Sequence, residues 1–194
     1  MERKLKRLLL SDLLVNSTKT QKIAYIGIMT ALLVVCNMFF EIKFADIQFS
    51  LTITICSLAG ILIGPLFGFC ACFLGDLVGF LYNSGGFAYM PWIGVAMGVV
   101  ALISGFIVNG ITLKYKGELY VKIAIIAVLT FILCTVIINT IPFWILYGKG
   151  VPFFTYLFTR LFIKGQIWNS LFNYALMMIT FPQILRLKPF RRKD

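Results

Sequence analysis

The 194-residue sequence has no histidine and only seven acidic residues, against 18 Lys and Arg. Histidine is the commonest general base and metal ligand, so its absence weighs against an enzyme or a metal site. The cysteines show no CxxC spacing and all fall in apolar runs, at Cys36, Cys56, Cys70, Cys72 and Cys134. We interpret them as small buried hydrophobes rather than disulfides or metal ligands. No GxxxxGK[ST] loop occurs, so the chain is not predicted to hydrolyse ATP itself, and no cofactor is expected.

Apolar residues dominate what remains: 60% of the chain is hydrophobic and the mean hydropathy is +0.95. Several apolar runs approach the length of about 20 residues that crosses a bilayer, which predicts an all-α, multi-pass protein of a bacterial cell membrane. The net charge of +11 would suggest nucleic acid in a soluble chain. Here the basic residues cluster at the chain ends and between apolar runs, the positive-inside pattern, so the bilayer is expected as partner and nucleic acid is not.

The charge distribution also predicts the topology. Six transmembrane helices with both termini cytoplasmic leave four of the 18 basic residues outside, at Lys43, Lys149, Arg160 and Lys164. The predicted spans, with a polar outer loop at 41–48, are 22–40, 49–63, 66–82, 91–112, 120–147 and 158–184.

The chain divides into three predicted segments. Residues 1–21 form a basic amphipathic N-terminal segment, 22–185 the six-helix membrane domain, and 186–194 a basic cytoplasmic tail. The first segment is too interrupted by Ser11 and Asp12 for a signal peptide. We expect a short interfacial helix lying on the cytoplasmic leaflet.

Small residues line one face of the first predicted span, at Ala24, Gly27 and Ala31. Small residues aligned in this way allow another helix to approach closely. The partner is either a neighbouring helix of the same bundle or a separate protein that docks on this face, and the residues do not distinguish the two.

The stretch GDLVGFLYNSGGFAYMPWIG, residues 75–94, contains Asp76, the one acid inside a predicted span. A charge in hydrocarbon costs a few kcal/mol or more, so such a residue usually faces a bundle interior or a cavity. The following loop carries Asn83 and Tyr89 and ends near Trp92. We interpret the stretch as one wall and the rim of a small-molecule pocket; the alternative is a carboxylate that only packs against a neighbouring helix. Gly75 and Gly79 predict close packing of the third helix on the fourth.

Polar residues also enter the last two predicted spans. Asn139 and Pro142 lie in the fifth, where the proline predicts a bend. In the sixth, Arg160, Lys164 and Trp168 are spaced to share one face, while a different face carries Gln166, Asn169 and Asn173. We expect Arg160 to contact an anionic ligand group. For Lys164, ligand contact and snorkelling to lipid headgroups are both open.

The segments GDLVGFLYNSGGFAYMPWIG and NTIPFWILYGKGVPFFTYLFTRLFIKGQIWN resemble the DL-x-G, N-T-x-W, L-Y-G-K-G and T-R-L-x-K regions of a known family. This family is the S components of energy-coupling factor (ECF) vitamin transporters, and the folate-specific members are the most similar. The sequence departs from the folate pattern at Met90, Trp92 and Ile93. The resemblance implies a membrane-embedded vitamin-binding subunit, without its own ATPase, that works with a transmembrane T component and two ATPase subunits.

The resemblance also implies roles for particular residues. The small face of the first span, Ala24, Gly27 and Ala31, is where S components meet the T component. The predicted substrate-binding residues are those that would read a pterin edge, stack on its ring or meet its glutamate tail: Asp76, Asn83, Tyr89, Trp92, Asn139, Trp144, Arg160, Lys164 and Asn169.

Other functions remain as alternatives. An S component for another vitamin or small heterocycle fits the same pattern. A self-sufficient small secondary transporter is disfavoured because no inverted repeat is evident and only one acid lies in a span. An intramembrane enzyme is the weakest alternative, since no nucleophile lies next to a base.

Overall fold

The computed structural model describes residues 11–15, 17–44, 47–82, 88–111 and 117–186. The predicted site residue Asn83, most of the N-terminal basic segment and the tail beyond 186 lie outside the described residues. In chain order the elements are α2 (Asp12–Val15), α3 (Lys19–Phe39), β1 (Glu41–Phe44), β2 (Ile47–Ser50), α4 (Thr52–Ile63), α5 (Pro65–Tyr82), α6 (Pro91–Gly110), α7 (Glu118–Thr130), the π-helical η1 (Phe131–Asn139), α8 (Thr140–Tyr147), α9 (Phe153–Phe158), the π-helical η2 (Thr159–Ile163) and α10 (Gln166–Ile184).

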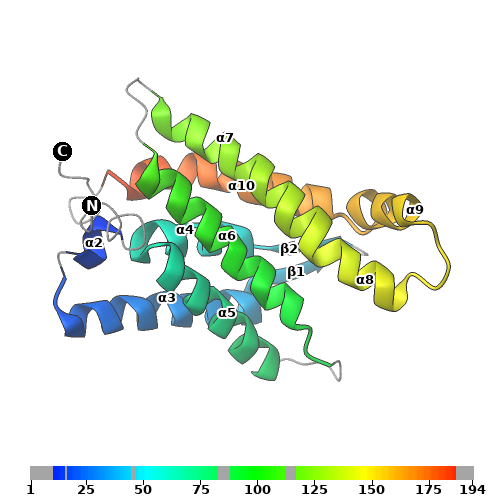
Figure 1. Cartoon of the computed structure of the whole chain (residues 1–194), viewed down its shortest axis with the longest axis horizontal. Helices are drawn as coiled ribbons and strands as arrows, with labels where there is room; N and C mark the ends of the chain where they lie inside the picture. Colours follow the sequence, from blue (N-terminus) through cyan, green and yellow to red (C-terminus); the bar gives the residue numbers. More distant parts are fainter. Residues whose placement is uncertain (1–10, 16, 45–46, 83–87, 112–116, 187–194) are drawn as a thin grey trace.

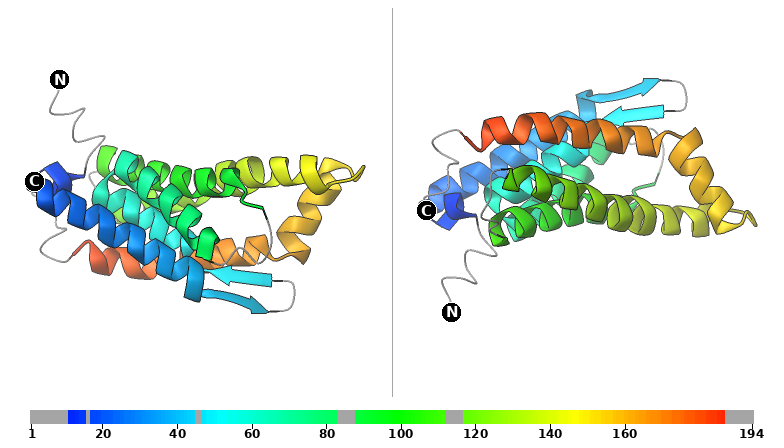
Figure 2. Two further views of the ribbon diagram at one scale, coloured as in Figure 1. Left: turned by 90° about the horizontal axis from the view of Figure 1, so that it is seen from below. Right: turned by 90° about the horizontal axis from the view of Figure 1, so that it is seen from above.

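The helices form an elongated bundle (Figure 1). Four helical stretches within the described residues are long and apolar enough to cross a membrane: α3, α5, α6 and the continuous run Glu118–Tyr147. Two shorter apolar helices, Thr52–Ile63 and Phe153–Ile163, accompany them. The all-α membrane class is therefore confirmed, whereas the count of six crossings stays a prediction. Helix α2 and the end of α10 lie at the same end of the molecule, as an even number of crossings requires (Figures 1 and 2).

Glycines on α4 and α6 allow these helices to meet backbone to backbone. A Cβ added to Gly60 would overlap the carbonyl group of Ala101, and one added to Gly105 would lie 2.6 Å from the Gly60 carbonyl oxygen. Only residues without a side chain permit such an approach. The buried core around this contact includes Cys56 and Cys72. All five cysteines are free, and four are buried as predicted, but Cys70 is exposed.

The glycine pair of α5 packs differently from the prediction. An added Cβ on Gly75 would lie 2.8 Å from Leu33 Cβ, and one on Gly79 would lie 3.1 Å from Asn37 Cβ. Both of these neighbours belong to α3, so the pair seats the first helix and not the fourth. The predicted close packing of α5 on α6 is nevertheless present, and glycines of α6 allow it: a Cβ added to Gly98 would lie 2.5 Å from the Phe69 ring of α5. The prediction was wrong only in the role of Gly75 and Gly79, because spacing along one helix does not say which neighbour lies on that face.

The predicted outer loop at 41–48 is instead an antiparallel hairpin, in which Glu41 pairs with Ser50. Helix α4 accordingly begins at Thr52, later than the predicted start of the second span at 49. Within each strand the apolar residues are two positions apart, at Ile42 and Phe44 in β1 and at Ile47 and Phe49 in β2. This is the period of a strand and not of a loop.

The predicted sixth span is broken near its start. Helical segment η2 ends at Ile163 and α10 begins at Gln166. Gly165 between them has φ +69°, the left-handed conformation that glycine adopts without steric cost. Figure 2 shows α9 crossing from the end of α8 to the start of α10. Arg160 and Trp168 therefore do not share the continuous face that their spacing predicted.

The fifth predicted span is one long helix with an irregular middle. Its π-helical segment ends at Asn139, just before Pro142, and the helix continues to Tyr147. The Thr140 hydroxyl donates to the carbonyl oxygen of Thr135 at 2.8 Å. π-Helical segments within α-helices occur frequently at functional sites. A wider helical segment thus precedes Pro142, whereas the bend expected at the proline stays a prediction.

Candidate ligand-binding site

Asp76 lies on the inward face of α5 and is 8% exposed. The Tyr89 hydroxyl donates to its Oδ2 at 3.1 Å. Gly94, in the first turn of α6, makes room for this pair: an added Cβ would lie 2.7 Å from the Tyr89 hydroxyl and 3.0 Å from Asp76 Oδ2. The hydrogen bond thus joins the middle of α5 to the residues that lead into α6.

Tyr89 stays protonated and able to donate this bond. Burial raises the pKa of its hydroxyl to about 12, and the neighbouring Asp76 charge acts in the same direction. The Tyr89 ring also packs on Phe80, with ring centroids 5.2 Å apart. Both contacts fix the chain directly before Met90, the residue that precedes α6.

We expect Gly94→Ala to weaken ligand binding without unfolding the bundle. The new methyl group would force the Tyr89 hydroxyl away from Asp76, and losing one hydrogen bond of about 1 kcal/mol corresponds to roughly fivefold in affinity. Titration of the purified variant with ligand measures this. Gly27→Ala is the matched control, because nothing lies within 4 Å of a Cβ added there. An unchanged affinity of Gly94→Ala would separate the Asp76–Tyr89 pair from the ligand site.

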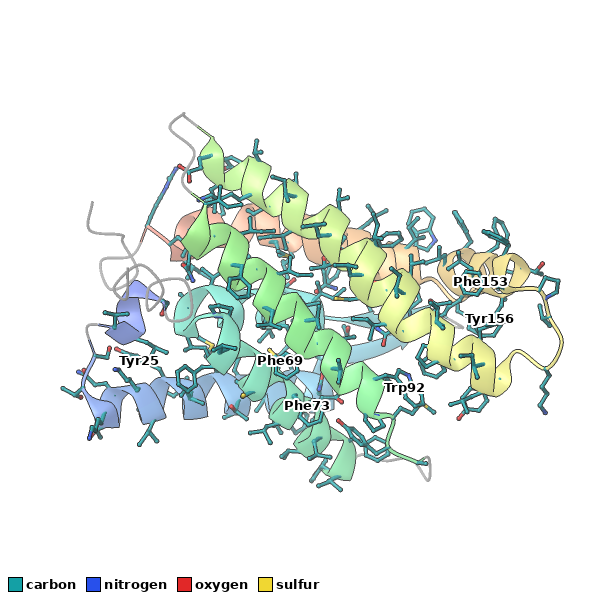
Figure 3. All side chains as sticks on the ribbon, viewed as in Figure 1. Tyr25, Phe69, Phe73, Trp92, Phe153 and Tyr156 are labelled. Carbon is teal, nitrogen blue, oxygen red and sulfur yellow. The ribbon has the colours of Figure 1, made fainter. Side chains whose placement is uncertain are left out.

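A second cluster is centred on Phe143 of α8. The Arg160 guanidinium lies 4.1 Å from the centroid of the Phe143 ring. Trp92 of α6 meets the same ring edge to face, at 5.7 Å and an interplanar angle of 89°. Figure 3 shows Trp92 at the first turn of α6, on the side that faces α8. Three distant segments of the chain therefore converge on one aromatic side chain.

Three polar atoms near this cluster are buried without a hydrogen-bond partner among the described residues. They are Trp92 Nε1, Asn139 Oδ1 and Arg160 Nε. Asn139 stands one helical turn before Phe143, and residues four apart share a helix face. The rest of the Arg160 guanidinium meets the Tyr156 side chain. Because buried polar atoms in proteins are nearly always paired, the unpaired Trp92 N–H, Asn139 oxygen and Arg160 Nε indicate a site for a polar ligand.

Sequence reasoning did not select Phe143. It is one of 19 phenylalanines, and nothing in its spacing distinguishes it from residues that face lipid. The available signal was its position one turn after Asn139, a polar residue already assigned to the site.

Other predicted site residues contact protein groups. Trp144 Nε1 donates to the Val151 carbonyl oxygen at 2.8 Å, and its ring packs on Phe153 at 5.5 Å. These contacts close the connection between α8 and α9, where Figure 3 labels Phe153. Lys164 is exposed at the break before α10.

Asn169 belongs to a buried polar network that joins α10 to β2 and α4. Its Oδ1 accepts from the Ser50 backbone N–H at 2.9 Å. Asn173, fully buried one turn later, donates to the Ser50 carbonyl oxygen at 2.7 Å and accepts from the Thr54 hydroxyl at 2.8 Å. The two asparagines hold the hairpin end and the start of α4 against α10 by satisfied hydrogen bonds.

The small face of α3 is exposed. Ala24, Gly27 and Ala31 all lie on the surface, and a Cβ on Gly27 would meet nothing within 4 Å. Within this 21-residue helix only Leu33 and Cys36 are buried. The small residues are therefore not used for packing among the described helices of this chain.

The fold and these contacts define a helical membrane protein with a buried cluster in which three polar atoms have no hydrogen-bond partner in the described part of the chain. The family model for the S component of ECF-type riboflavin transporters matches residues 17–184. The chain belongs to this family of S components. Its members are substrate-binding transport subunits and not enzymes, and they work in the prokaryotic cell membrane with a T component and ATPase subunits. The resemblance drawn from sequence is confirmed at this level.

Among solved structures, the chain is similar to the crystal structure of FolT bound with folic acid. The TM-score is 0.65 at 22% identity, and the match covers 92% of this chain and 100% of that chain. At this identity the likeness shows the shared fold. No curated protein sequence matches the chain.

Proposed function

We propose that this S component binds folate, or a vitamin of the same chemistry, in the cluster around Phe143. The observation that carries the proposal is a set of buried atoms without hydrogen-bond partners among the residues that the structure describes: the Trp92 donor, the Asn139 acceptor and Nε of the Arg160 cation. A planar heterocycle with a polar edge satisfies the first two and stacks on aromatic rings. An acidic tail satisfies the third.

The tail distinguishes folate from riboflavin, the vitamin after which the matching family is described. Both vitamins have a planar ring system with donors and acceptors on its edge. Riboflavin carries a neutral polyol chain, whereas folate ends in a glutamate with two carboxylates. Arg160 has no carboxylate within 4.0 Å in the described part of the chain. A half-buried guanidinium without a counter-ion favours the anionic ligand.

The remaining site residues receive roles within this proposal. Asp76, Asn83 and Asn139 read the ring edge, with Asp76 using the oxygen that does not hold Tyr89. Tyr89, Trp92 and Trp144 form the aromatic surroundings. Arg160 meets the tail, with Lys164 and Asn169 at the margin. The contacts of Trp144 and Asn169 with Val151 and Ser50 make these two the least available for direct ligand contact.

The exposed small face of α3 is proposed to dock on the T component. Membership of the family supplies the partner, and small residues without neighbours in the chain supply a surface that a helix of the partner can approach closely. We place this docking half of α3 on the cytoplasmic side, as the six-crossing topology predicts. The energy for uptake then comes from the ATPase subunits.

Titration of the purified protein with folate and with riboflavin tests the ligand. Two charge-assisted hydrogen bonds of about 1.5 kcal/mol each predict folate binding roughly 100-fold tighter than riboflavin. Mass spectrometry of the ligand released from freshly purified protein provides an independent identification. Tighter binding of riboflavin, or release of riboflavin from the purified protein, would contradict the proposal.

A further inference from the structure

The short helix α2 packs against the end of the bundle through Ser11 and Leu14, which are both buried. The Ser11 hydroxyl donates to the carbonyl oxygen of Leu62, in the last turn of α4, and accepts from the Leu14 backbone N–H at 3.3 Å. The last carbonyls of a helix lack donors within the helix. One hydroxyl therefore pairs with a carbonyl oxygen in the last turn of α4 and with the N–H of Leu14 in α2. The position of this helix at the cytoplasmic leaflet stays a prediction.

Leu14 is the apolar anchor of this seat. Its side chain is fully buried, in a cluster with Ile63 and Ala71. Tyr25 and Ile26 of α3 pack against the same cluster. Figure 3 shows Tyr25 between α2 and the first turns of α3. Leu14 thus fills the space between the end of α4, the start of α5 and the first half of α3.

The first half of α3 is otherwise attached through Met29, which packs against this cluster and against the main core. The buried residues of this helix, Leu33 and Cys36, lie in its second half, as does the contact of Leu33 with Gly75. Tyr25 and Ile26 point inward to Leu14, while Ala24 and Gly27 on the opposite side are exposed. Because a helical turn is rigid, the seat under Tyr25 and Ile26 sets the position of the exposed small face.

We infer that α2 is a brace that holds the small face of α3 in the position at which the T component binds. The inference rests on the proposed docking function of Ala24, Gly27 and Ala31. It assigns to Ser11 and Leu14 a role in association with the partner subunit, although neither lies on the docking face. The partner contacts α3, and α2 determines where α3 lies.

Leu14→Ala in the full chain, co-expressed with the T component and the ATPases, tests the brace. Removing the buried side chain leaves a hole under Tyr25 and Ile26, so we expect a roughly tenfold loss of association in pull-down. Ligand affinity of the variant is expected to be unchanged, because the Phe143 cluster is formed by α6, α8 and η2. Val15→Ala is the matched control, since Val15 belongs to the same short helix but is 39% exposed. Leu14→Met retains the volume and should restore association.

Ser11→Ala is a milder second variant that removes the cap of Leu62 and leaves Leu14 in place, and it should reduce association in the same direction. If both variants associate with the T component as strongly as the parent does, α2 is not a brace. Stronger association than the parent's would also overturn the inference, because α2 would then compete with the T component for α3. Loss of ligand binding together with association would show that α2 supports the whole fold instead. The docking face is tested separately by substituting Gly27 and Ala31: if those variants fail to associate while Leu14→Ala associates normally, only the brace is wrong.

Discussion

Arg160→Ala is expected to lower folate affinity by about 10- to 150-fold, the equivalent of a charge-assisted hydrogen bond of roughly 1.5–3 kcal/mol. Arg160 stacks on Phe143 at 4.1 Å and keeps a buried Nε without a partner among the described residues. A ligand carboxylate that pairs with this guanidinium is stabilised by the opposite charge and by hydrogen bonds of fixed, planar geometry. Arg160→Lys should recover only part of the affinity, because an ammonium group cannot present the planar fork of a guanidinium.

A ligand without the acidic tail separates direct pairing from general damage to the site. 6-Methylpterin has the ring of folate and no carboxylate, so it should bind parent and Arg160→Ala equally. Lys149→Ala serves as the charge control: this cation is exposed and has no place in the proposed site, so its loss should change affinity little. Equal folate affinity in parent and Arg160→Ala, or equal losses for folate and 6-methylpterin, would remove Arg160 from the tail contact.

The membrane class and most helix positions follow from hydropathy alone. The apolar run at 66–82 and the Gly64–Pro65 turn before it predict α5 closely, because in a bilayer long uninterrupted apolar runs have no competing structure. The hairpin at 41–50 and the break at Gly165 were missed. In both places a short local signal, a two-residue period in one and a single glycine in the other, was outweighed by the expectation of complete spans.

The site was predictable in part. Asp76 could be selected because an acidic side chain in an apolar helix is costly unless it has a polar partner. In the structure this partner is Tyr89. The convergence of Trp92, Phe143 and Arg160 could not be predicted, since it depends on how α6, α8 and η2 meet across the bundle. Nor does sequence spacing show that the Asn169 side chain already accepts a hydrogen bond from the backbone N–H of Ser50, 119 residues away. Long-range contacts of this kind decide which polar residues remain available to a ligand.

Replacing Gly27 and Ala31 together by tryptophan is expected to abolish association with the T component and vitamin uptake by cells. Two large side chains would hold any partner helix away from α3. Within the chain they should be tolerated, because Ala31 is exposed and nothing lies within 4 Å of a Cβ on Gly27. Folate affinity of the isolated double variant should therefore stay near that of the parent.

The control for this experiment is a pair of tryptophans elsewhere on the same helix. Leu32 and Phe39 are also exposed, at 38% and 69%, and at about 100° per residue they lie roughly a quarter of a turn or more around the helix from Gly27 and Ala31. Leu32→Trp with Phe39→Trp therefore adds bulk to α3 away from the proposed contact. This control should retain association and uptake. Affinity, pull-down and uptake measured on both double variants then distinguish docking from packing. If the Gly27 and Ala31 variant still associates with the T component, α3 is not the docking helix; if it loses folate binding as well, the small face serves the fold of the chain itself.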